Sequence, residues 1–311
     1  RFNGLSAKSE NIMEISVIIP SYNTQSVIAD TIDSVLKQST DFAFEVIVVD
    51  CSEHEQVKEV VAAFPNVNFT HQVERFNPGI GRNIGANLAK GKLLLFLDAD
   101  VILQDGALKE ALKEYASGKQ VFGGSLELNA MKSKSVSGTF EHYFFNHESQ
   151  VGRTQQERKN LSSAFMCVDK ALFLTEGGFK NIARMQDTEL TERLASQGVR
   201  LYFCPSLVAL QTQDSPLKSV FRKIFINGRN LYSIRYKDSS SISKKVVLFL
   251  LLPFLSLAKG IRIIARHLRY QTLRNKFKTF LLAPLLLFGA MVWMVGFYYS
   301  MIFGLPISET R

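Results

Sequence analysis

The sequence predicts an α/β fold in which helices flank a mainly parallel sheet, followed by a basic and apolar C-terminal region. Two observations predict this fold. Over the first hundred residues, short apolar segments of strand length alternate with amphipathic segments of helix length, the order typical of parallel sheets. The apolar segments also lack the alternation of polar and apolar residues seen in half-exposed strands, as expected for strands covered on both faces.

The predicted elements follow one another in a regular order. The strands are residues 15–20, 44–50, 66–73 and 92–98, and the helices between them cover 27–36, 55–64 and 81–90. Asn23 or Thr24 can cap the first helix. Beyond residue 104 the pattern predicts a helix over 105–117, strands over 120–128 and 162–168, a mobile polar loop over 146–161, a helix over 186–198 and a strand over 200–205.

The positive charge of the chain lies in its C-terminal third. The net charge is +9, yet residues 215–278 alone contain 15 Lys or Arg residues and a single acidic residue, Asp238. Residues 217–236 carry apolar side chains near one side and basic ones around the others, typical of a helix lying on anionic lipid. A helix packed on the preceding domain, with a solvated basic face, fits the same pattern equally well.

Two apolar segments in this region predict membrane attachment. Residues 280–307 carry no charge and are long enough to cross a bilayer. Residues 246–258 are short and contain Pro253. A full crossing by 246–264 would also place the basic residues up to Lys278 on the outer side, against the positive-inside tendency. We therefore expect a re-entrant or interfacial segment at 246–264 and one crossing at 280–305, with a two-helix hairpin as the alternative.

These patterns divide the chain into four parts and predict its location. We expect an N-terminal extension over 1–13, a catalytic domain over 14–214, a basic linker at the membrane surface over 215–245 and a membrane region over 246–311. Residues 1–12 lack the apolar core of a secretion signal, and the three cysteines show no metal-ligand spacing. We expect the catalytic domain to face the cytosol at the cytoplasmic membrane.

Two carboxylates, Asp98 and Asp100, end the strand KLLLFLD and are separated by one alanine. Residues two apart in a strand point the same way, and open α/β sheets bind ligands beyond the carboxyl ends of their strands. Two close carboxylates suit a hard divalent cation, Mg²⁺ or Mn²⁺, that takes its remaining ligands from a diphosphate. The alternative is that both aspartates lie in a solvated turn and bind no metal, because an Asp-x-Asp triplet alone is a weak signal of a metal site.

Three further residues are expected near this pair. Asp50 ends another predicted strand, and Arg82 stands at the start of a predicted helix, where an anion is favoured. Asp187 lies in the first turn of the helix predicted over 186–198, a position where a carboxylate also serves simply to complement the helix dipole. Neither a dinucleotide fingerprint nor a Walker motif is present in the sequence.

Five segments in this order give the chain a strong resemblance to the nucleotide-sugar-dependent family-2 glycosyltransferases of the GT-A fold. The segments are SVIIPSYN, EVIVVDCSEHE, GRNIGANLAKGKLLLFLDADVIL, EGGF and QDTELTERLASQG, and the resemblance covers roughly residues 14–230. It implies that nucleotide-sugar binding involves Pro20, Tyr22, Asn23, Asp50, Arg82 and Asp98. It also implies that Asp98 contacts the ribose side, that Asp100 contacts the metal and the diphosphate, and that Asp187 is the general base of an inverting transfer. With the carboxylate chemistry above, we expect Asp98 and Asp100 to hold the metal together.

Several residues depart from the family pattern. The loop after Asp50 reads DCSEHE, Gln186 replaces the first member of the acidic pair, and Gln211 stands where many relatives place a histidine. The QxxRW signature of processive synthases is missing, which favours transfer of single sugars. We expect a lipid-linked or membrane-proximal acceptor and contact with anionic membrane lipids, and no binding of nucleic acid. A non-catalytic membrane scaffold that retains the fold is the alternative.

Overall fold

The structure, a computed structural model, describes residues 13–236 and 241–304. Parts of three predicted regions lie outside these residues. They are the N-terminal extension apart from Met13, residues 237–240 of the linker, and the end of the membrane region from residue 305, which includes the last residue of the expected crossing at 280–305.

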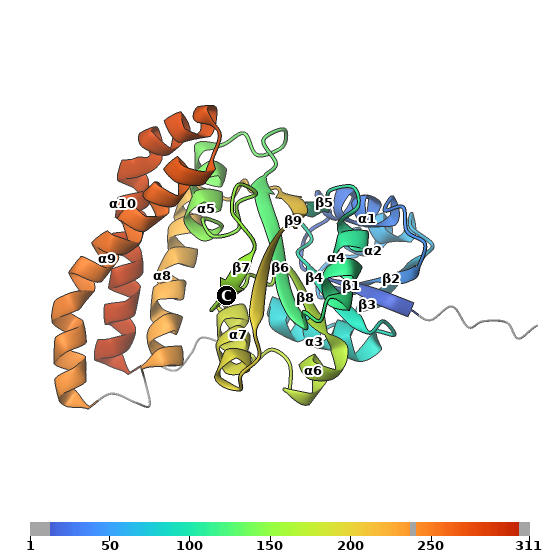
Figure 1. Cartoon of the computed structure of the whole chain (residues 1–311), viewed down its shortest axis with the longest axis horizontal. Coiled ribbons are helices and arrows are strands. Elements are labelled where there is room, and N and C mark those ends of the chain that lie inside the picture. The colour runs from blue at the N-terminus through green and yellow to red at the C-terminus, as the bar shows by residue number, and fades with distance from the viewer. Residues whose placement is uncertain (1–12, 237–240, 305–311) are drawn as a thin grey trace, which may run out of the picture.

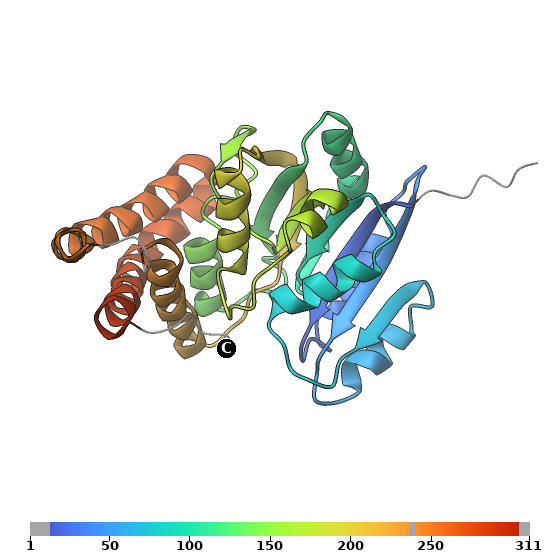
Figure 2. The same ribbon diagram turned by 90° about the horizontal axis from the view of Figure 1, so that it is seen from below.

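A mixed sheet with helices on both faces forms the body of the protein (Figures 1 and 2). Its strand order is β3-β2-β1-β4-β8-β6-β9-β5, and β7 pairs with β9. The strands are β1 (Met13–Ser21), β2 (Ala43–Asp50), β3 (Val67–His71), β4 (Leu93–Leu97), β5 (Val101–Leu103), β6 (Val121–Leu128), β7 (Gln156–Arg158), β8 (Phe165–Asp169) and β9 (Leu201–Gln211). The first half, from β3 to β4, is parallel, whereas β8 runs antiparallel to both β4 and β6.

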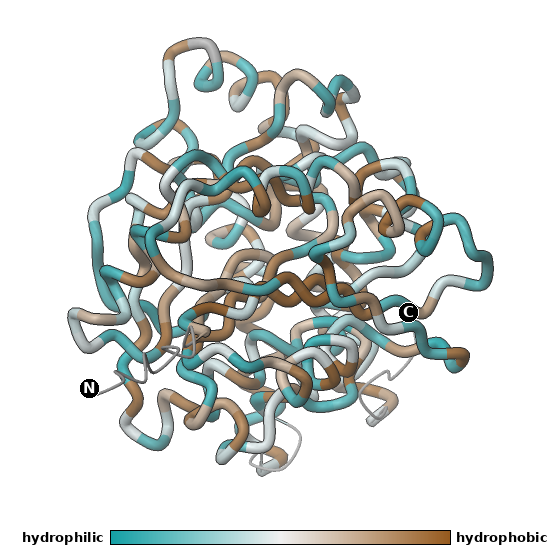
Figure 3. The backbone as a smooth tube through the Cα atoms, turned by 90° about the vertical axis from the view of Figure 1, so that its right-hand side faces the viewer, coloured by the Kyte–Doolittle hydropathy of each residue, from teal (hydrophilic) through white to brown (hydrophobic). Residues whose placement is uncertain are grey.

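Successive residues of the central strands contribute to two separate cores. On β4, Leu95 and Leu97 belong to the core that also contains helix residues Ile32 and Leu108, whereas Phe96 packs on the opposite face with Phe173. The first face is covered by α1 (Ile28–Leu36), α2 (Gln56–Ala62) and α4 (Ala107–Ala116), and the second by α3 (Pro78–Leu88), α6 (Lys170–Thr175) and α7 (Gln186–Ser196). Coverage of both faces explains the unbroken apolar strands, which lie at the centre of Figure 3.

Four helices form a third core beside the sheet. They are α5 (Val136–Phe145), α8 (Leu217–Arg235), α9 (Ile242–Tyr270) and α10 (Leu273–Phe303), and Figure 1 shows α9 and α10 on the side of the molecule away from β1 to β3. Apolar residues of α8, among them Val220 and Ile224, are buried against α5 and α10. Of the two alternatives for residues 217–236, the structure therefore has the helix packed within the protein.

Helices α8 and α10 approach each other through glycine. A Cβ atom on Gly228 would lie 2.0 Å from the carbonyl oxygen of Trp293, and one on Gly296 would lie 2.1 Å from that of Phe225. Both separations are far below van der Waals contact, so only glycine permits this crossing.

The structure differs from the predicted elements, or adds to them, in several places. The stretch expected to be a mobile loop over 146–161 contains β7, which pairs with β9. The basic residues expected between two apolar segments lie on α9 up to Tyr270 and on α10 from Leu273. Helix α9 continues through Pro253. Within the described residues, α9 and α10 are the two helices long and apolar enough to cross a membrane.

Candidate active site

Asp98 and Asp100 lie in a turn rather than in a strand. β4 ends at Leu97, and the backbone N–H of Val101 donates to the Asp98 carbonyl at 3.0 Å before β5 begins. The Thr31 hydroxyl donates to the carbonyl of Ala99 at 2.7 Å, which fixes the middle of the turn. Burial, and then the negative charge of Asp98, raise the pKa of Asp100 to about 7. Both residues line the same cavities, described below, and a turn rather than the pleat of a strand brings them together.

Arg82 carries the cation that faces this pair. Asn77 caps α3 by accepting from the N–H groups of Gly79 and Ile80, so the helix begins three residues earlier than predicted, and Arg82 lies in its second turn. The guanidinium, only 3% exposed, forms an ion pair with Asp98, and its Nε–H has no hydrogen-bond partner. A buried donor without a partner is costly unless a ligand accepts from it.

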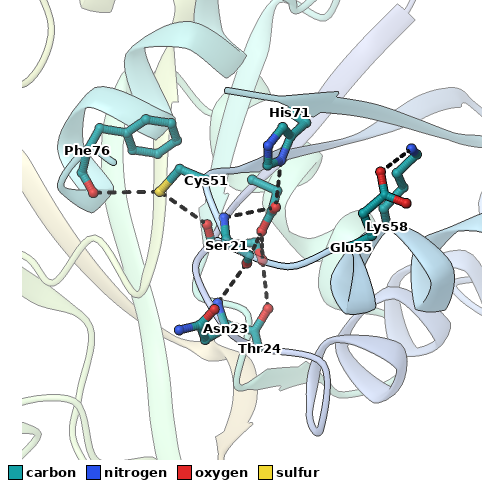
Figure 4. Close-up of polar contacts among 10 residues, drawn as sticks. Ser21, Asn23, Thr24, Cys51, Glu55, Lys58, His71 and Phe76 are labelled. Atoms are coloured by element: carbon teal, nitrogen blue, oxygen red, sulfur yellow. Dashed lines mark hydrogen bonds and ion pairs between the residues drawn. The ribbon is translucent and has the colours of Figure 1, made fainter. Parts of the chain in front are cut away.

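Asp50 lies at the end of β2 but points into the protein. Its carboxylate accepts hydrogen bonds from the hydroxyls of Ser21 and Ser52 at 2.8 and 2.7 Å and from the Ser52 N–H at 3.0 Å. The Nδ1 atom of His71 lies 3.1 Å away (Figure 4). These contacts connect the loops after β1 and β2, and Asp50 lines neither of the cavities described below.

Asp187 lies in the first turn of α7. It follows Met185, whose φ of 68° is unusual for a residue other than glycine. The carboxylate accepts from the N–H groups of Thr188 and Ser163 at 2.8 and 3.3 Å. Burial nevertheless raises the pKa of Asp187, which makes this carboxylate a stronger base than a solvated one.

Two cavities meet at the aspartate pair. One, of about 1110 Å³, lies beside the parallel half of the sheet and is lined by Pro20, Tyr22 and Asn23. The other, of about 540 Å³, is lined by Arg82 and Asp187. Asp98 and Asp100 line both cavities. A substrate in each cavity would therefore be in contact with the same two carboxylates.

The wall of the smaller cavity contains residues that the sequence did not indicate. Helices α8 and α9 contribute Lys223, Asn227, Lys259, Arg262 and Arg266 to it. The last three follow one another at intervals of three and four residues, so they share one face of a helix. This spacing is visible in the sequence, but it places the three residues on one face only if residues 259–266 form a helix.

The aspartate pair fits a divalent cation that is completed by substrate oxygens. Asp98 and Asp100 provide hard oxygen ligands, and a cation between them would offset the repulsion of the two charges, which contributes to the raised pKa of Asp100. Among the described residues, no group of three or more His, Cys, Asp or Glu side chains could hold a metal ion. Gln211, in the position where relatives have histidine, donates from Nε2 to Asp100 at 3.3 Å.

Comparison with known families gives one match that covers half of the chain. Residues 16–177 match the family described as "Glycosyl transferase family 2". The chain is 36% identical over 107 residues to the poly(ribitol-phosphate) β-N-acetylglucosaminyltransferase TarS of Staphylococcus aureus, an alignment covering 32% of this chain and 18% of that protein. It is 28% identical over 173 residues to a GalNAc(5)-diNAcBac-PP-undecaprenol β-1,3-glucosyltransferase of Campylobacter jejuni, covering 53% of this chain and 54% of that enzyme.

The aligned part is less than two thirds of these relatives. An uncharacterised glycosyltransferase of Haemophilus influenzae aligns over 62% of its own length, with 27% identity and 59% of this chain covered.

Two solved structures share the fold. The crystal structure of S. aureus TarS 1–349 in complex with UDP-GlcNAc superposes with a TM-score of 0.52 and 18% identity, covering 94% of this chain and 92% of that one. GalNAc-T7 with UDP, GalNAc and Mn²⁺ superposes with a TM-score of 0.54 and 15% identity, covering 76% and 53% of the two chains. The likeness confirms the predicted fold class.

Proposed function

The chain belongs to glycosyl transferase family 2, and we propose that it transfers a sugar, with inversion, from a nucleoside-diphosphate sugar to a lipid-linked or membrane-proximal acceptor. The observation that carries this proposal is the meeting of two cavities at Asp98 and Asp100. The larger cavity would hold the donor and the smaller one the acceptor. The reacting carbon would then lie between the aspartate pair and Asp187.

The proposed donor site uses residues of the larger cavity. Tyr22 lies there with the Arg75 guanidinium 4.2 Å above its ring, a planar platform suited to a nucleobase. Pro20 and Asn23 would contact the nucleoside, and Asp98 its ribose side. The TarS complex with UDP-GlcNAc supports a uridine nucleotide. Asp50 would act indirectly, by holding the loops that carry Tyr22 and Asn23.

Asp98 and Asp100 would hold Mg²⁺ or Mn²⁺, and GalNAc-T7 with bound Mn²⁺ supports a divalent ion. Such an ion, when bound, neutralises the charge of a leaving diphosphate. Arg82 would add its own positive charge from the other side and could donate its unpartnered Nε–H to a phosphate oxygen.

Asp187 would remove the proton from an acceptor hydroxyl in the smaller cavity. The freed oxygen attacks the anomeric carbon as the bond from that carbon to the diphosphate breaks, and the diphosphate leaves with the bonding electrons. A single displacement of this kind inverts the anomeric configuration. A carboxylate with a raised pKa is a suitable base for this step.

Helices α9 and α10 would attach the protein to the cytoplasmic membrane. Large apolar side chains are exposed along both helices, for example Phe254 at 71% and Phe280 at 72%. Many exposed large apolar side chains on two neighbouring helices are typical of a membrane-binding site. Basic residues near the ends of the two helices, such as Lys244 on α9 and Lys278 on α10, would contact anionic lipid headgroups.

We propose that α9 and α10 lie in the plane of the membrane surface. Helix α8 packs along α10, with the Ser233 and Ser300 hydroxyls 3.1 Å apart, and Arg235 of α8 forms an ion pair with Glu192 of α7. If α10 crossed the bilayer in this arrangement, α8 and this ion pair would enter the hydrocarbon region, which is costly. If α9 and α10 lie in the plane of the membrane surface, only their exposed apolar side chains enter the hydrocarbon region.

The proposed activity is tested with purified chain in detergent and a panel of nucleotide sugars with Mn²⁺. We expect one nucleotide sugar to be cleaved slowly by water and to raise the melting temperature, because a ligand stabilises the folded state it binds. Asp100→Asn should lower cleavage by roughly 10²-fold or more, because it removes a charge beside the leaving group. Asp105→Asn, an exposed change outside both cavities, is the matched control.

Two outcomes would contradict the proposal. If no nucleotide sugar binds or is cleaved, the chain is better explained as a non-catalytic membrane scaffold. Gln186 and Gln211, which stand in place of the family's usual residues, would then account for the missing activity. If Asp100→Asn is as active as Asp105→Asn, the aspartate pair does not form the site.

A further inference from the structure

Three basic residues of α9 turn toward the proposed acceptor cavity. Lys259, Arg262 and Arg266 line it together with Asp187. Large apolar side chains of the same helix are exposed elsewhere, for example Ile261 and Leu257, each at 53%. The helix therefore presents a cationic face to the cavity and an apolar surface to its surroundings.

The positive charges on this face exceed the negative charges nearby. Glu148 is the carboxylate beside them, and it forms ion pairs with Arg266 and with Arg158, the latter at 3.8 Å. In the described part of the chain, no carboxylate lies within salt-bridge distance of Lys259 or Arg262. The Lys259 ammonium instead lies over aromatic rings, 5.2 Å from the centre of Trp293.

The Glu141 and Lys223 side chains complete the charge balance of this wall. They pair with each other, and Lys223 also donates to the Ser215 hydroxyl at 2.8 Å. Their charges therefore cancel, and among the described residues Lys259 and Arg262 form no ion pair.

His147 adds a neutral donor to the same cavity. Its Nδ1 lies 2.8 Å from the Arg266 guanidinium. Because arginine has only N–H donors, this Nδ1 must accept, and the proton of the neutral ring is on Nε2. The cavity wall thus offers an N–H group of the imidazole beside three cations.

We propose that Lys259, Arg262, Arg266 and His147 bind a phosphoryl group of the acceptor. The inference rests on the proposed function and adds to it the chemical class of the acceptor. Guanidinium and ammonium groups are the usual phosphate ligands of proteins. A phosphoryl group held there would place the adjoining part of the acceptor in the cavity that contains Asp187. An apolar chain attached to the phosphate could leave along the exposed apolar side of α9.

Trp293 provides a direct readout of binding. It is the only tryptophan of the chain, and Lys259 lies over its ring. The probe is farnesyl phosphate, titrated into the purified full chain in detergent while tryptophan emission is recorded. Farnesol tests the apolar chain alone, and inorganic pyrophosphate tests a phosphate without a lipid. We expect farnesyl phosphate or pyrophosphate to change the emission with saturation, and farnesol to bind much more weakly.

Matched variants of α9 locate the site. Arg262 is exposed, so Arg262→Gln should fold normally, and we expect it to weaken phosphate binding by roughly tenfold to a hundredfold. Arg269→Gln makes the same change on the same helix outside the cavity and should bind as the wild type does. Saturation by pyrophosphate alone would identify a soluble phosphate compound as the ligand, and saturation by farnesyl phosphate alone would identify a lipid.

Two results would overturn the inference. One is farnesol binding as tightly as farnesyl phosphate, and the other is Arg262→Gln behaving like Arg269→Gln. Cleavage of nucleotide sugars by the wild-type chain is measured separately. Phosphate binding without cleavage would contradict the proposed function but support the phosphate site. Cleavage without phosphate binding would support the proposed function but contradict the phosphate site.

Discussion

At the residue scale, the proposed role of Asp187 gives a pH dependence. The group acts as a base only when ionised, and burial raises its pKa in the folded protein. Transfer should therefore be fully active above this raised pKa and fall as the pH is lowered through it. Asp187→Asn should reduce transfer by roughly 10²- to 10⁴-fold and remove this acid limb. Initial rates of sugar transfer between pH 4 and 8 measure both effects. An unchanged acid limb in the variant would assign the titration to another group.

Asp50 permits a second prediction at this scale. The resemblance assigned it to nucleotide binding, whereas its carboxylate is 1% exposed and accepts several hydrogen bonds from the protein. Asp50→Asn replaces one accepting oxygen by a donor, so we expect the free energy of unfolding to fall by about 1–3 kcal/mol. Urea denaturation measures this change. A large loss of nucleotide affinity with unchanged stability would instead favour direct contact with the nucleotide.

Residue types at strand ends could be predicted from the sequence, but side-chain directions could not. Asp98, Asp100 and Arg82 were expected to lie together, and the structure brings them to one cavity. Asp50 also follows an apolar strand, yet it points into the protein because Ser21 and Ser52 satisfy it there. The sequence pattern does not tell whether a carboxylate at a strand end lines the cavity or points into the protein, because its direction depends on the loops that meet at the sheet edge.

At the scale of elements, Pro253 explains why the sequence understated α9. A proline inside a helix removes one backbone hydrogen bond. Together with the short apolar run and the positive-inside tendency, Pro253 favoured a re-entrant or interfacial segment at 246–264. The carbonyl of Phe249, four residues earlier, instead accepts from the Tyr298 hydroxyl at 2.7 Å. A partner from α10 therefore replaces the lost bond. Such long-range compensation is invisible to local patterns, as is the pairing that makes a strand of Gln156–Arg158.

This compensation predicts coupling between two substitutions. Tyr298→Phe should destabilise the chain by about 1 kcal/mol, because it leaves the Phe249 carbonyl without its donor. In a Pro253→Ala background the helix can supply the missing N–H, so the same change should have little effect. A double-mutant cycle on the free energy of unfolding in detergent measures the difference. Equal effects in both backgrounds would show that the hydroxyl does not serve this carbonyl.

At the scale of the whole molecule, the C-terminal helices pack into the rest of the protein. Helix α9 gives three cations to the smaller cavity, and α8 packs against α5 and α10. From the sequence alone, the length and apolar composition of residues 280–305 favoured a membrane crossing. Neither property indicates which elements pack beside the helix. The ion pair between Arg235 and Glu192 supplies the argument for an in-plane arrangement.

The orientation of α10 can be decided by labelling its two ends. The native cysteines Cys51, Cys167 and Cys204 are buried, so their background reactivity should be low. We introduce Lys278→Cys or Phe303→Cys and treat sealed vesicles of either orientation with a membrane-impermeant maleimide. If α10 lies in the plane of the membrane, both positions react from the same side, because a helix that does not cross keeps both ends on one face. Labelling from opposite sides would establish the crossing and require α8 to separate from α10. Reaction of both variants in detergent serves as the control for accessibility.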